Sequence, residues 1–110
     1  MPVPMRLRSG LLGVAAAFLV SGCGPEPASS PAAARGRQVY LAQCTACHAA
    51  DPAQAGPVGP PVKGSSRELL EAKVLRGTYP PGYRPKRPTQ VMPPQPSLAP
   101  ELDALAEYLR

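Results

Sequence analysis

The residues best suited to chemistry stand together in Cys44-Thr45-Ala46-Cys47-His48, where two thiols three positions apart are followed at once by the only histidine of the chain. Cysteines at this spacing lie on one side of a helical turn, so both thiols can add to the two vinyl groups of one porphyrin edge. The adjacent imidazole can then bind the porphyrin iron. The same side chains could instead serve as a redox thiol pair, as zinc ligands or, for the two cysteines, as a structural disulfide.

The rest of the chain bears on these alternatives. A thioredoxin-like thiol pair begins a helix of a βαβ domain, and the sequence shows no alternation of strand and helix patterns. A zinc site normally takes four ligands, whereas one such Cys pair and one His are available here. A disulfide between Cys44 and Cys47 would span only two intervening residues, although an oxidising compartment permits one. The spacing therefore favours haem attachment through Cys44 and Cys47, with His48 on the iron.

Beyond this motif, residues 35–110 resemble the class I c-type cytochromes. Met92 stands in Val91-Met92-Pro93-Pro94, which is similar to the methionine loop of that family. The resemblance implies one covalent haem c whose iron has His48 and Met92 as axial ligands. A core-filling methionine is the alternative, but the Pro-rich segment around Met92 is unsuited to a helix or a central strand.

A second part of the resemblance is Gly59-Pro60-Pro61-Val62-Lys63-Gly64, which is similar to the G-P-x-L-x-G segment of the family. By this match the Pro60 carbonyl would accept a hydrogen bond from Nδ1 of His48, orienting the ring and raising its basicity. Gly56-Pro57 offers a competing register, and a cluster of Gly and Pro can also be a simple turn.

Three segments carry helical patterns. The first covers residues 32–47 and ends in the Cys-His motif. The second begins at Ser65-Ser66-Arg67-Glu68, which has the form of a capping box, and stops at Gly77. Pro100 is expected in the first turn of the third, whose apolar stripe consists of Leu98, Leu102, Leu105 and Leu109.

The resemblance also implies that the first and last helices cross near Gly36, where Tyr40 and Tyr108 would pack. Few other large apolar side chains are available, because the chain has no Trp and its single Phe, Phe18, lies in the N-terminal segment. We therefore expect a porphyrin to supply much of the bulk of the core. The predicted fold is all-α: a small three-helix class I cytochrome c fold around one covalent haem, with a Pro-rich loop carrying the Met ligand.

The N-terminal residues predict an export signal. Arg6 and Arg8 form a basic start, and the apolar run over 10–20 is too short to span a membrane, which takes about 20 residues. Val20-Ser21-Gly22-Cys23 resembles the bacterial lipobox, in which the cysteine is lipidated. Three parts are therefore predicted: a lipoprotein signal peptide over 1–22, lipidated Cys23 with a flexible Pro/Ala/Ser tether over 23–34, and a cytochrome c domain over 35–110.

The charge distribution bears on partners. The net charge of +5 includes Arg6 and Arg8, so the exported chain would carry an excess of only three basic residues. An exported protein of this charge is not expected to bind nucleic acid. We expect the haem domain to be monomeric and to be held at the membrane by its lipid. Its expected partners are redox proteins that present acidic docking surfaces to it. The candidate docking residues are Arg84, Lys86 and Arg87, just before Met92.

Two axial ligands leave no open position on the iron, and the chain has no cluster of acids, bases or nucleophiles, so no enzyme activity is predicted. The predicted function is single-electron transfer in a respiratory or related chain, alone or as a subunit of a larger oxidoreductase. The expected place is the periplasmic or extracytoplasmic side of the cell envelope. Two alternatives stay open: a copper- or thiol-handling lipoprotein, and a haem-based sensor with a displaceable Met92.

Overall fold

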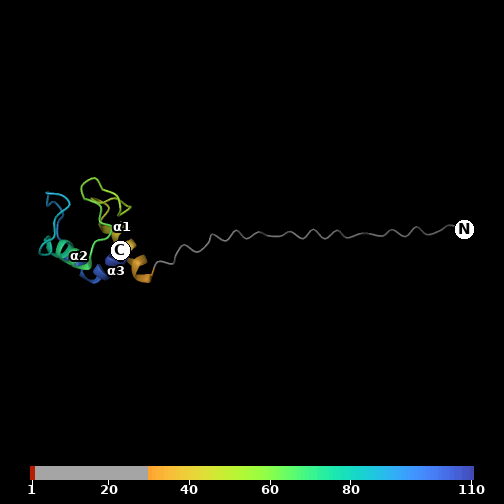
Figure 1. The fold of residues 1–110 in the computed structure, drawn as a ribbon. Helices are drawn as coiled ribbons and strands as arrows, with labels where there is room; N and C mark the ends of the chain where they lie inside the picture. Colours follow the sequence, from red (N-terminus) through yellow and green to blue (C-terminus); the bar gives the residue numbers. More distant parts are fainter. Residues whose placement is uncertain (2–29) are drawn as a thin grey trace.

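The computed structural model describes Met1 and residues 30–110, so the predicted signal peptide, Cys23 and most of the predicted tether lie outside the described residues. Residues 30–110 contain no strand (Figure 1). None of their helices is long and apolar enough to cross a bilayer. The predicted all-α fold is confirmed, and its helical elements are α1 (Pro31–Gln43), α2 (Arg67–Leu70), the π-helix η1 (Glu71–Leu75), the 3₁₀-helix η2 (Pro96–Glu101) and α3 (Leu102–Leu109). Because η1 continues α2 and η2 leads into α3, these elements form three helical segments.

Helix α1 begins and ends earlier than the sequence pattern predicts. The side chain of Ser30 accepts a hydrogen bond from the Ala33 N–H at 3.1 Å. Pro31, which has no N–H to satisfy, occupies the first turn. Residues 31–34, expected in the flexible tether, are therefore helical. At its other end α1 stops at Gln43, so the Cys-His motif lies in a turn after the helix.

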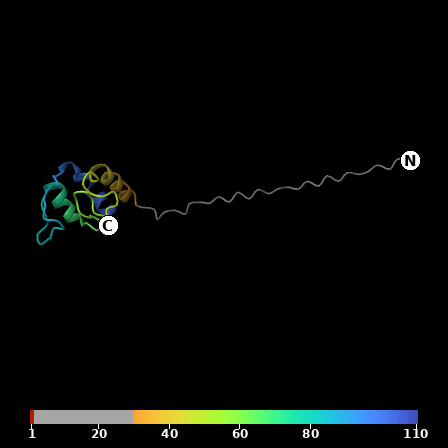
Figure 2. The same ribbon diagram turned by 90° about the horizontal axis from the view of Figure 1, so that it is seen from above.

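Helices α1 and α3 cross at Gly36. A Cβ atom on Gly36 would overlap the carbonyl oxygen of Ala104 and come within 2.8 Å of the Tyr108 Cβ. Tyr40 is buried beside this crossing, and its ring centroid lies 5.5 Å from that of Tyr108 with the planes tilted by 51°. Figure 2 shows the same two helices side by side from a second direction. The expected crossing is confirmed, and it depends on the missing side chain of Gly36.

Ser66, and not Ser65, caps the second helical segment. The Ser66 side chain accepts a hydrogen bond from the Leu69 N–H at 3.1 Å, whereas the Ser65 hydroxyl donates to a carbonyl of the preceding turn at 2.6 Å. Leu69 thus takes the position that a capping box gives to Glu68, so the predicted box is wrong by one residue. The segment stops as predicted at Gly77, whose φ of +68° is the left-handed conformation that glycine adopts readily.

The leucine stripe of the third segment forms the centre of the core. Leu102 and Leu105 are each 1% exposed. Pro100 lies inside η2, ahead of α3, so its missing N–H does not interrupt an α-helix. The stripe packs against buried side chains of the other two segments, namely Val39, Tyr40, Leu70 and Val74.

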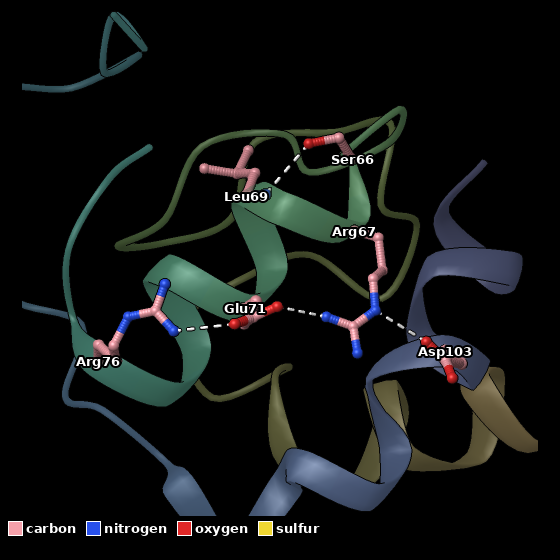
Figure 3. A network of polar contacts seen from close by, with 6 residues as sticks. All are labelled: Ser66, Arg67, Leu69, Glu71, Arg76 and Asp103. Atoms are coloured by element: carbon pink, nitrogen blue, oxygen red, sulfur yellow. Dashed lines mark hydrogen bonds and ion pairs between the residues drawn. The ribbon is translucent and has the colours of Figure 1, made fainter. Parts of the chain in front are cut away.

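Exposed ion pairs join the second segment to the third (Figure 3). Arg67 contacts Glu71 at 2.6 Å on its own segment and Asp103 at 2.9 Å on α3. Glu71 also contacts Arg76 at 3.1 Å, and this hydrogen bond holds the pKa of the Glu71 carboxyl below its usual range. Because solvent screens such pairs, they orient the helices more than they stabilise them.

Candidate haem-binding site

One cavity lies between the end of α1, the second helical segment and the loops that follow them. Its volume, including the part open to solvent, is about 1020 Å³. Segments far apart in the chain bring all five candidate haem-contacting residues to its wall: Cys44, Cys47, His48, Pro60 and Met92. Apolar side chains of the core, such as Leu70, Val74 and Leu105, complete the lining.

The Cys-His motif forms a turn at the end of α1. The N–H groups of Cys47 and His48 both donate to the carbonyl of Cys44, at 3.2 and 2.9 Å. The Thr45 hydroxyl donates to the Leu41 carbonyl at 2.9 Å, which satisfies a carbonyl in the last turn of the helix. Burial raises the pKa of the Cys44 thiol to about 11, so this sulfur is neutral at pH 7. The turn thus presents two cysteines and one imidazole to the same cavity.

The imidazole of His48 is held by the segment that follows the turn. Its Nδ1 lies 3.0 Å from the carbonyl oxygen of Pro60. Because a carbonyl only accepts, Nδ1 carries the proton, and the lone pair of Nε2 is left for a metal ion. The N–H groups of Val58 and Gly59 donate to the Cys47 carbonyl at 3.2 and 2.8 Å, so this segment is also fastened to the motif.

Gly59 is needed for this close packing. A Cβ atom there would overlap the His48 ring and lie 2.8 Å from its Nε2. On the other side of the turn, the Tyr40 hydroxyl donates to the carbonyl of Ala49 at 2.6 Å, tying α1 to the residue after His48. Burial is the main cause that raises the pKa of Tyr40 to about 12, so it donates at any physiological pH.

Met92 reaches the cavity from the irregular segment 78–95. The N–H of Gln95 donates to the Val74 carbonyl at 2.6 Å, which fastens the end of this segment to η1. Met92 is half-buried and packs against the hydrophobic core, whereas its neighbour Val91 is 64% exposed. The loop therefore directs its thioether inward.

The three basic residues expected to dock a partner differ in their contacts. Lys86 and Arg87 donate to backbone carbonyls of the segment 58–61, at 2.8 and 2.6 Å. Both therefore join the loop that carries Met92 to the segment that holds the imidazole. Arg84 is exposed and makes no hydrogen bond or ion pair with any other residue of the described range 30–110.

Lys73, Tyr79 and Tyr83 also line the cavity, and the sequence patterns assigned no role to them. The two tyrosine rings stack with their centroids 5.3 Å apart, and Nζ of Lys73 lies 4.4 Å from the centroid of Tyr79. The sequence spacing does indicate that Lys73 lies near the core. It follows Leu70 by three residues and precedes Val74, and both of these are on the apolar face of their helix.

These residues fit a covalently bound porphyrin. Two thiols, an imidazole with an available Nε2 and a thioether meet at one largely apolar cavity, and Gly59 makes room for the imidazole. Within residues 30–110, no three His, Cys, Asp or Glu side chains converge as they would around a bare metal ion. The two thiols, the imidazole and the thioether are suited to a porphyrin that already contains its iron.

The helical fold and this site define a class I c-type cytochrome. The model of the family described as "Cytochrome C oxidase, cbb3-type, subunit III" matches residues 31–109, so the chain belongs to this family. It therefore carries covalently attached haem c and takes part in electron transfer. Cytochrome c domains of this kind are exported to the periplasmic side. Neither curated proteins nor solved structures gave a match to the chain.

Proposed function

We propose that this protein is a membrane-tethered monohaem cytochrome c that passes single electrons between redox proteins of a respiratory or related chain. The observation that carries the proposal is the meeting of Cys44, Cys47, His48 and Met92 at one cavity. Haem iron, when bound, supplies a ferrous–ferric couple. Electron transfer through it requires no acid, base or nucleophile from the protein, and no Asp or Glu of residues 30–110 lines the cavity.

Each residue has a distinct role in this proposal. Cys44 and Cys47 would hold the haem through thioethers, and His48 and Met92 would bind its iron. The Pro60 carbonyl accepts the Nδ1 proton of His48, which keeps the ring in one tautomer and one orientation. A thioether ligand favours ferrous iron and raises the reduction potential relative to two imidazoles. If both His48 and Met92 bind the iron, a carrier is favoured over an enzyme.

The membrane tether is the second part of the proposal. Cys23 is the site of lipidation and residues 1–22 are an export signal, as the basic start, the apolar run and the small residues before Cys23 support. Two acyl chains on one protein anchor it stably, whereas one chain gives marginal binding. The lipid would keep the haem domain close to membrane-bound redox partners.

Protein produced in a host that matures c-type cytochromes is expected to be coloured and to keep its haem after acid–acetone extraction. Replacing both Cys44 and Cys47 with alanine should abolish the non-extractable haem, because no thioether can form. The matched control Cys23→Ala should retain the haem and lose only membrane association. The measurements are the reduced-minus-oxidised spectrum and detergent phase partitioning. A colourless wild-type protein that binds Cu(I) would contradict the proposal and support copper handling instead.

Arg84, Lys86 and Arg87 are proposed to face an acidic redox partner. The Arg84→Glu variant is expected to be reduced several-fold more slowly by such a partner at low salt, with the difference vanishing as salt screens the charges. Arg84 is preferred for this test because Lys86 and Arg87 also hold the loop through backbone carbonyls. Stopped-flow kinetics against ionic strength measures the effect.

The control for this experiment is Arg37→Glu, which makes the same change in net charge at an exposed position on α1 that does not line the cavity. Equal rates and equal salt dependence in the two variants would show that the loop does not steer the partner.

A further inference from the structure

Lys73 is half-buried, but among the buried side-chain nitrogen and oxygen atoms of residues 30–110 its Nζ is the one that has no hydrogen-bond partner. It lies on η1 between buried Ala72 and Val74, and its side chain reaches the wall of the haem cavity. The Nζ atom lies over the ring of Tyr79, 4.4 Å from its centroid. An aromatic face compensates a buried ammonium less well than a carboxylate does.

The charges around the cavity are one-sided. Within the part of the chain that the structure describes, Lys73, Lys86 and Arg87 line it, and no Asp or Glu does. The nearest acid along the helix, Glu71, is occupied by Arg67 and Arg76 outside the cavity. Lys86 and Arg87 already donate to backbone carbonyls, so Lys73 is the cation that has no acceptor of its own among residues 30–110. A buried cation in this state points to an anionic group supplied by whatever fills the cavity.

We propose that the Lys73 ammonium binds a propionate carboxylate of the haem and, with Tyr79 beside it, forms an internal anion-binding subsite of the cavity. This inference rests on the proposed function, since it takes the haem as the occupant. Haem carries two carboxylates on an otherwise apolar ring, so burying one of them in this cavity needs a cation that is itself buried. Lys73 is then a cofactor-binding residue and not only a part of the helix.

The pairing has a consequence for the reduction potential. An uncompensated propionate next to the iron favours the ferric state, which has one more positive charge than the ferrous state. Lys73 would cancel this charge at short range and in a site of low polarity, so it raises the potential. An exposed lysine has a much smaller effect, because water and salt screen it.

The test uses the haem-loaded protein. In Lys73→Met, which keeps an unbranched chain and removes the charge, the midpoint potential is expected to fall and the propionate modes in the resonance Raman spectrum to shift. Lys73→Arg should restore both towards the wild type. Lys63→Met removes the same charge from an exposed position that does not line the cavity and should change neither. Lys73→Gln, a neutral donor, provides a second variant should Lys73→Met assemble poorly, and it should give an intermediate shift.

The inference is overturned if Lys73→Met, or Lys73→Gln in its place, matches Lys63→Met in both potential and propionate modes. It is also overturned if the near-infrared sulfur–iron band shifts while the propionate modes stay constant, because Lys73 would then act on Met92. Failure of the proposed function looks different, since the wild-type protein itself would then carry no covalent haem.

Discussion

Replacing Met92 with alanine is expected to abolish the weak near-infrared band of the sulfur–iron bond and to lower the midpoint potential by a sizeable part of the ~0.8 V range that axial ligands span. Residues 30–110 contain no second Met, and the only His is already engaged through Nδ1 with Pro60. No side chain of the same kind can therefore take the place of Met92. The haem should stay attached, because Cys44 and Cys47 are unchanged. Spectroelectrochemistry measures both effects.

Gln90 in the same Pro-rich loop supplies the control for this prediction. Gln90 is exposed and does not line the cavity, so Gln90→Ala alters the loop sequence without changing a candidate ligand. It should leave the band and the potential as they are. If Met92→Ala also keeps the band and the potential, the iron has a different sixth ligand and the carrier proposal loses its main chemical argument.

The second large effect is expected at Gly36, where an alanine should destabilise the haem-loaded protein by about 3 kcal/mol. The added Cβ would overlap a backbone atom, the Ala104 carbonyl oxygen, which cannot move aside by changing a rotamer. α1 and α3 would have to separate, and the contact between Tyr40 and Tyr108 would loosen with them. We expect the melting temperature of the haem-loaded protein to fall by roughly 10 °C or more.

The sign of the change at Gly36 distinguishes packing from helix propensity. In an isolated helix, alanine is more favourable than glycine by about 1 kcal/mol, so propensity alone predicts stabilisation. Gln38→Ala, at an exposed position of the same helix, should be close to neutral. A Gly36→Ala protein as stable as the wild type would mean that the two helices do not cross as closely as the structure shows.

Local features could be read directly from the order of residues. The spacing of Cys44, Cys47 and His48 already defines haem attachment chemistry, because a single turn sets the distances between these side chains. The leucines of the third segment could be assigned to the core from their period alone, and Gly77 could be assigned to a helix end. The family resemblance predicted the crossing at Gly36. Short-range geometry and periodicity thus determined the fold class and the motif.

Errors of one to four residues arose at helix ends. The pattern placed the capping box one position too early at Ser65 and extended the first helix to Cys47, while the predicted tether ran to residue 34 although the helix begins at Pro31. Neighbouring serines are equally good caps on chemical grounds, and alanine suits both a helix and a flexible linker. Only the three-dimensional course of the chain decides between such equal local choices.

The tertiary structure decided which charges lie around the cavity. The apolar neighbours of Lys73 along its helix indicate a position near the core, but nothing in the sequence separates Lys86 and Arg87 from other basic residues. Packing of η1 against the loop over 78–95 places Lys73 in the lining of the cavity with its Nζ over the ring of Tyr79, while Lys86 and Arg87 reach the carbonyls of the segment 58–61. The sequence by itself therefore determined the chemistry of attachment, because that depends on neighbours along the chain. The electrostatics around the haem depend on which distant segments meet, and so they were decided only by the fold.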